Sequence, residues 1–189
     1  MPEDLTREAL MAYACLYLFF LAWGLRLIAY DCLGGDIGGS FMHNINLPFH
    51  EFGHLLFRPF GQWLMFLGGS LFQFLLPLLL GGVFLLREGK PFPATLCLWW
   101  AGENLLDLAP YIGDARTMDL PLVGEWNEEL AELRILRHDW HNILEPMGLL
   151  AWDHRLAVFA HAIGALLMVL AWAWGGWWLW HARRQVVLG

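Results

Sequence analysis

The amino-acid sequence predicts an all-α protein, a polytopic membrane helix bundle with about four to five membrane segments. Two observations support this fold class. Hydrophobic residues make up 58% of the 189 residues and charged residues only 15%, whereas about a quarter of the residues in a soluble domain are charged. In addition, several stretches reach the roughly twenty apolar residues that a helix needs to cross a bilayer.

Three segments are clear candidates for spanning helices, namely Ala9 to Tyr30, Trp63 to Leu86 and Leu156 to Trp180. The first follows an acidic N-terminus and has no small-residue cleavage site before Asp31, which favours a retained span over a signal peptide. The last ends in a cluster of Trp followed by basic residues, which is typical of a helix that meets a headgroup layer.

Two weaker segments contain the polar residues. Phe41 to Phe57 contains several histidines, and Phe92 to Ile112 contains Glu103, Asn104 and Asp107. Ionisable groups at membrane depth are costly unless they pair, bind a metal ion or face a wet cavity. We therefore expect the apolar helices to surround a polar centre, with the histidine-bearing helix either embedded in the membrane or re-entrant.

The rest of the chain predicts one membrane domain over residues 1–189, with a polar connection at about 115–155 that forms one or two short surface helices. No repeat or long linker divides the sequence.

The net charge of −7, without a basic patch, argues against nucleic-acid binding. The 3 Cys are scattered, so they indicate neither a disulfide framework nor a Cys-based zinc site.

The most specific motif is H-E-x-x-H, formed by His50-Glu51-Phe52-Gly53-His54. Residues four apart lie on the same face of a helix, so both imidazoles can bind one metal ion with Glu51 beside it. Two packed core histidines are the competing explanation. An open zinc site also needs a third protein ligand and leaves its fourth position for water.

Two stretches could supply the third ligand. Asn104, Asp107, Tyr111 and Asp114 lie at i, i+3, i+7 and i+10, which places them on one stripe of a helix that Pro110 would weaken. The other source is a group that contains His138, Asp139 and His141. Its polar surroundings are equally typical of a solvated helix face.

These motifs make the chain similar to a small member of the site-2 protease family of intramembrane zinc metalloproteases. That family pairs an H-E-x-x-H helix with a later span containing Asn, Pro and an Asp ligand, often with Gly-Pro-x-x-Asn between them. Here Gly69 to Gln73 has Ser and Gln in place of that Pro and Asn. Asn104 to Asp114 matches loosely, because Asp follows Asn by ten residues rather than about eight, and Ala115 replaces a Gly. The resemblance covers roughly residues 41–116.

The resemblance implies that His50, His54 and Asp114 hold Zn²⁺, with Asp107 as the alternative ligand or a supporting carboxylate. Glu51 would act as the catalytic base, and Asn104 would bind the substrate backbone or the developing oxyanion. It also implies an enzyme, a zinc-dependent metalloendopeptidase, that hydrolyses peptide bonds in or near the membrane-spanning helices of substrate proteins. The protein would be a multi-pass integral membrane protein in the lipid bilayer of a bacterial inner (cell) membrane.

A function of a different class is a non-catalytic metal-binding membrane protein, either a metal transporter or an inactive protease relative. Transport favours carboxylates along a path together with inverted repeats, and the sequence has no visible repeat. Glu51 favours chemistry, because holding a metal does not require it. The glycines around the motif predict either a mobile gate or close helix packing, and they are Gly34, Gly35, Gly38, Gly39, Gly61 and Gly68.

Overall fold

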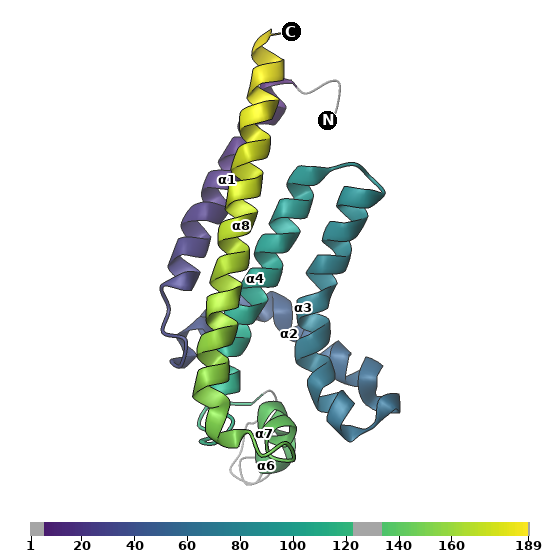
Figure 1. Cartoon of the computed structure of the whole chain (residues 1–189), viewed down its shortest axis with the longest axis vertical. Coiled ribbons are helices and arrows are strands. Elements are labelled where there is room, and N and C mark those ends of the chain that lie inside the picture. The colour runs from purple at the N-terminus through teal and green to yellow at the C-terminus, as the bar shows by residue number, and fades with distance from the viewer. Residues whose placement is uncertain (1–5, 123–133, 189) are drawn as a thin grey trace.

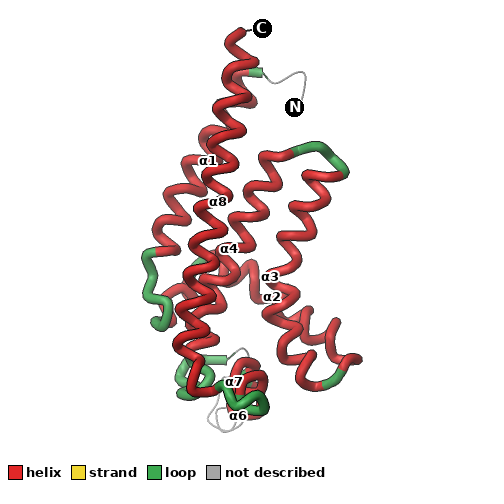
Figure 2. Tube along the Cα trace, in the orientation of Figure 1, coloured by secondary structure: helices red, strands yellow, loops and turns green. Residues whose placement is uncertain are grey.

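The computed structural model describes residues 6–122 and 134–188, and the regular structure within these ranges is entirely helical (Figures 1 and 2). This confirms the all-α prediction for the described part of the chain. In chain order the α-helices and short 3₁₀ helices (η) are α1 Arg7–Ile28, η1 Gly35–Gly39, α2 Phe41–Phe57, η2 Arg58–Phe60, α3 Gln62–Leu86, α4 Pro91–Gly113, α6 Arg134–Arg137, α7 Asp139–Leu144, η3 Leu150–Trp152 and α8 Asp153–Leu188.

Within the described residues, three helices are long and apolar enough to cross a membrane, and they match the three clear segments of the sequence. They are α1, α3 and the stretch Leu150–Gln185 that includes most of α8. Their exposed faces carry large apolar side chains such as Phe19, Leu79 and Phe159. These features are those of a membrane protein, because such faces are stable against lipid rather than water.

The two weaker segments also form helices, and α2 has the bounds expected from the sequence. Helix α4 lies between α8 and α3 (Figure 1) and packs against both. Its polar residues Glu103, Asn104 and Asp107 are all buried, as the sequence predicts for a polar centre inside apolar helices. A Cβ on Gly102 would lie 2.6 Å from the carbonyl oxygen of Gly164, so α4 and α8 cross with their backbones in close contact.

Helices α2 and α3 form a hairpin that brings the histidine motif against α3. The turn begins α3 after Gly61, whose φ of +104° favours glycine. Gly53 of α2 packs directly on the backbone of Gly68 of α3. A Cβ on Gly53 would collide with the carbonyl oxygen of Gly68. The structure therefore assigns Gly68 to close helix packing and Gly61 to a turn, which leaves neither as evidence for a gate.

The polar connection contains two short helices, α6 and α7, and its residues 123–133 lie outside the described part. Helix α7 packs on α3, where Ile143 and Leu144 are buried against Phe66. It lies near the start of α8 (Figure 1). The expectation of a surface helix is wrong for α7, because Asp139 and His141 are buried as well. This burial brings a polar segment from late in the chain to the histidines of α2.

Candidate metal centre

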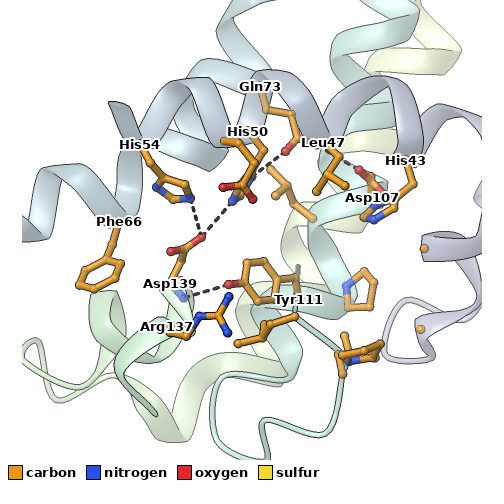
Figure 3. A pocket seen from close by; sticks show the side chains of 18 of the residues that line it. His43, Leu47, His50, His54, Phe66, Gln73, Asp107, Tyr111, Arg137 and Asp139 are labelled. Carbon is orange, nitrogen blue, oxygen red and sulfur yellow. Dashed lines mark hydrogen bonds and ion pairs between the residues drawn. The ribbon is translucent and has the colours of Figure 1, made fainter. Parts of the chain in front are cut away.

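Two helices from distant parts of the sequence meet at the candidate metal centre. His50 and His54 lie one turn apart on α2, and Asp139 is the first residue of α7. The Oδ2 atom of Asp139 lies 2.9 Å from Nε2 of His50 and 3.1 Å from Nε2 of His54. All three potential ligand atoms lie within 4.8 Å of one another. Figure 3 shows the two rings and the carboxylate pointing toward one another, so this group could hold a metal ion.

The opposite nitrogen of each ring is held by an oxygen atom. His50 Nδ1 lies 2.9 Å from Oε1 of Gln73, and His54 Nδ1 lies 2.8 Å from the carbonyl oxygen of Met65. These oxygens only accept hydrogen bonds, so Nδ1 is the protonated nitrogen in each neutral ring. The Nε2 lone pairs then face the Asp139 carboxylate, and only a proton or a cation between them makes this contact favourable. The donor set therefore fits a metal ion.

Gln73 connects the metal centre to a buried carboxylate on α4. Its Nε2 donates to Oδ2 of Asp107 at 3.1 Å, which fixes the amide with Oε1 toward His50. The same carboxylate also interacts with Asn46 Nδ2 at 3.1 Å and with His43 Nδ1 at 2.8 Å. Asp107 contacts Gln73 and His43 rather than the Nε2 atoms of His50 and His54, which is the position of a supporting carboxylate and not of a ligand.

Asp139 is held in place by its backbone as well as its side chain. Its backbone N–H donates to the hydroxyl oxygen of Tyr111 at 2.9 Å. Burial acts to raise the pKa of Asp139, but its interactions with His50 and His54 outweigh burial, so its pKa lies below the ordinary value. The carboxylate is therefore ionised at neutral pH, as a metal ligand must be.

The structure does not bring Asp114 to the histidines. Asp139 lies there instead, in the position that the family resemblance implies for Asp114. Helix α4 ends at Gly113, so the helical stripe does not extend to Asp114, which caps the helix instead. The Asp114 carboxylate closes the turn that follows, and these interactions lower its pKa although burial acts to raise it. Its partners are His138 Nε2 at 3.3 Å, Thr117 Oγ1 at 2.7 Å, and the backbone N–H groups of Asp119 and Leu120 at 2.8 and 3.0 Å.

The two expected catalytic residues lie in different surroundings. Glu51 is exposed on α2 and lines the same cavity as both histidines. Asn104 is fully buried and donates to the carbonyl oxygen of Trp100 at 2.9 Å, one turn earlier in α4. The structure does not place Asn104 among the residues that line this cavity, so its expected contact with substrate has no support in the geometry.

A cavity of about 620 Å³ opens in front of the metal centre. It follows α2 from His43 to His54 and is bounded on other sides by α4 and α7 (Figure 3). Leu47, Leu108 and Leu136 contribute apolar lining beside the polar groups. A concave, largely apolar space with a few convergent polar side chains is typical of a ligand-binding site.

Sequence reasoning gave Asp139 a secondary place and assigned no role to Gln73 or Tyr111 at the centre. The only sequence pattern that indicated Asp139 was the motif His138-Asp139-Trp140-His141, in which potential ligands lie close together. Of its neighbours, His138 contacts Asp114, and His141 Nδ1 lies 2.9 Å from the carbonyl oxygen of Ala115. No family model, curated protein or solved structure matches the chain.

Proposed function

We propose that the chain is an intramembrane zinc metalloprotease that hydrolyses peptide bonds in or near the membrane-spanning helices of other proteins. The observation that carries the proposal is the convergence of His50, His54 and Asp139 at one point, with Glu51 on the same cavity. In this arrangement Asp139 replaces Asp114, the third ligand that the resemblance implies. The roles of His50, Glu51 and His54 in the H-E-x-x-H motif are unchanged.

Zinc is the metal that we propose, because two imidazoles and one carboxylate form a donor set that it favours. Three protein ligands leave a fourth position for water, as in hydrolytic zinc sites. Zinc bound there would supply Lewis-acid chemistry, which eases the deprotonation of water and polarises a carbonyl group. Gln73 and Met65 hold the two rings with Nε2 toward the ligand position, and in the neutral ring they select the tautomer whose Nε2 lone pair can bind the metal.

Glu51 acts as the general base and then as the general acid. Its carboxylate accepts a proton from the attacking water as the water oxygen bonds to the peptide carbonyl carbon. Glu51 then donates that proton to the peptide nitrogen as the C–N bond breaks. The products are one new carboxyl terminus and one new amine, so no other reactant is required. The exposed position of Glu51 on the cavity gives it access to both water and substrate.

The membrane setting of this reaction is also a proposal. We infer that α2 and α4 lie at membrane depth beside α1, α3 and α8, which gives five membrane segments and a multi-pass protein. In this arrangement substrates reach the cavity through lipid, and the H-E-x-x-H helix is embedded in or re-enters the bilayer. A bacterial inner membrane is the location that the resemblance favours.

A non-catalytic metal transporter is the second candidate, and one observation favours it. Behind the metal centre, Asn46 Nδ2 donates to Oε2 of Glu103 at 2.9 Å and to Oδ2 of Asp107 at 3.1 Å. Buried carboxylates next to a metal position are features of ion pathways in membrane proteins. A transporter would not require Glu51, which separates the two functions experimentally.

The test compares wild type with Glu51→Gln after reconstitution in lipid with a panel of single-span substrates. Both proteins are expected to bind about one zinc per chain, since Glu51 is not a ligand, and only wild type is expected to cleave. Glu88→Gln is the matched control, because Glu88 is paired with Lys90 in the connection between α3 and α4, and neither residue lines the cavity. Cleavage by both proteins would overturn the role of Glu51. Zinc-loaded wild type that cleaves no substrate in the panel would favour the transporter.

A further inference from the structure

Tyr111 is a polar residue at the metal centre that the mechanism above does not use. It lies near the C-terminal end of α4, lines the cavity and faces α7 (Figure 3). Its ring lies 4.5 Å from the His138 ring and 6.1 Å from the His50 ring, measured between centroids. Contacts on two sides fix the ring, and therefore the position of its hydroxyl group.

The hydroxyl group of Tyr111 retains a hydrogen that it can donate. In its contact with the backbone N–H of Asp139, at 2.9 Å, the phenol oxygen is the acceptor. A phenol can donate one hydrogen bond at the same time as it accepts one. The residue that it contacts, Asp139, has its carboxylate against both histidines, at 2.9 Å from Nε2 of His50 and 3.1 Å from Nε2 of His54. Tyr111 also lines the same cavity as Glu51, so its hydroxyl group is placed to donate this hydrogen to a group bound at the candidate centre.

We propose that Tyr111 is a catalytic residue whose hydroxyl group donates a hydrogen bond to the peptide carbonyl oxygen as that oxygen gains negative charge. The proposal rests on the proposed protease function. It assigns to Tyr111 the stabilising role that the family resemblance implies for Asn104, which is not among the residues that line the cavity. The phenol keeps its proton throughout, since it stabilises charge by hydrogen bonding and transfers nothing.

Such a donor acts in the transition state more than in the bound substrate, because the oxygen carries most charge at that stage. Removing one oxyanion donor typically lowers kcat by about 10²- to 10³-fold. Tyr111→Phe should therefore reduce kcat by about this factor while KM changes little. The ring remains in Tyr111→Phe, so the packing against His138 and His50 is preserved.

The test measures binding as well as turnover. Substrate affinity is measured in the Glu51→Gln background, where turnover is blocked, and should be the same with Tyr or Phe at position 111. The second probe is a phosphinic analogue of the substrate peptide, whose tetrahedral phosphorus carries two oxygens in place of the reacting carbonyl. Tyr111→Phe should weaken binding of this analogue by a factor close to its loss in kcat. The control is Tyr17→Phe, which removes a hydroxyl group that contacts Trp172 at the α1–α8 contact.

Three outcomes would overturn the proposal. Unchanged kcat and unchanged analogue affinity in Tyr111→Phe would show that the hydroxyl group contacts no reacting atom. Loss of zinc from Tyr111→Phe would assign the hydroxyl group to holding Asp139 in place, a purely structural role. Zinc-loaded wild type that neither cleaves substrate nor binds the analogue would overturn the proposed function itself, and the assignment of Tyr111 with it.

Discussion

Gln73 on α3 fixes the imidazole of His50, because its Oε1 accepts a hydrogen bond from Nδ1 of that ring at 2.9 Å. The amide is itself oriented by Asp107, so a buried carboxylate on α4 acts on the metal centre through one intermediate side chain. Groups that hold a ligand in this way tune metal affinity without touching the metal. This connection makes Gln73 and Asp107 testable positions.

Gln73→Leu should weaken metal binding by about 10- to 100-fold, the range found when a ligand loses its supporting hydrogen bond. Leu fills a similar volume, so the main change is loss of the oxygen that accepts from His50. Competition with a chelator of known affinity measures the effect in detergent. Gln62→Leu at the start of α3 is the control. Equal affinity for Gln73→Leu and wild type would mean that the amide does not orient His50.

Asp107→Ala should weaken metal binding through the same route. Its effect should not add to that of Gln73→Leu, because the carboxylate reaches His50 only through the amide. Chelator competition on the two single variants and the double variant measures this coupling. Fully additive losses would show that Asp107 acts on the centre by another path, for example as a ligand in its own right.

Asp139→Ala should lose most of its zinc, whereas Asp114→Ala should keep about one zinc per chain. The two aspartates differ in what their carboxylates contact, since Asp139 faces the imidazoles and Asp114 closes a turn. Metal analysis of the purified proteins distinguishes them. Asp114→Ala should instead lower the free energy of unfolding by about 1–3 kcal/mol, the cost of buried groups left without their partner. Zinc loss in Asp114→Ala alone would restore Asp114 as the ligand.

Gly69→Ala should displace the histidines and abolish metal binding. A Cβ at this position would lie 2.6 Å from Nε2 of His50 and 2.7 Å from Nε2 of His54, which is closer than the atoms can approach. Gly82→Ala on the same helix is the matched control, because its Cβ would meet nothing within 4 Å. Zinc content and elution as a folded particle are measured for both. Normal zinc content in Gly69→Ala would show that the rings do not lie against this glycine.

Local patterns in the sequence were sufficient to predict the long helices and to place His50 and His54 on one face of α2. The bounds of α2 follow from its apolar and motif residues, and the spacing of His50 and His54 requires only that this segment is helical. The three apolar spans follow from length and composition. Each of these features depends on residues that are neighbours in the sequence.

The third member of the candidate site, Asp139, could not be predicted in the same way, because its position depends on contacts between distant segments. Asp114 and Asp139 are both acidic residues near polar neighbours, and only the fold shows which one reaches α2. Asp114 lies just past the end of α4 at Gly113, outside the helical stripe that points to the histidines. Asp139 lies beside them because Ile143 and Leu144 of the same helix pack on Phe66. The environment of Asn104 likewise depends on α4 being enclosed by its neighbours.

The position of Asp139 late in the chain also determines when the candidate centre is completed during synthesis. Asp139 lies 89 positions after His50 in the chain, and a ribosome releases the N-terminal residues first. The hairpin of α2 and α3 can therefore form and pack while the candidate centre still has only two of its three members. For the proposed protease, this order keeps the newly made helices α1 to α4 inactive as an enzyme until α7 docks. Under that proposal, neighbouring nascent membrane proteins would not meet a partly assembled active site.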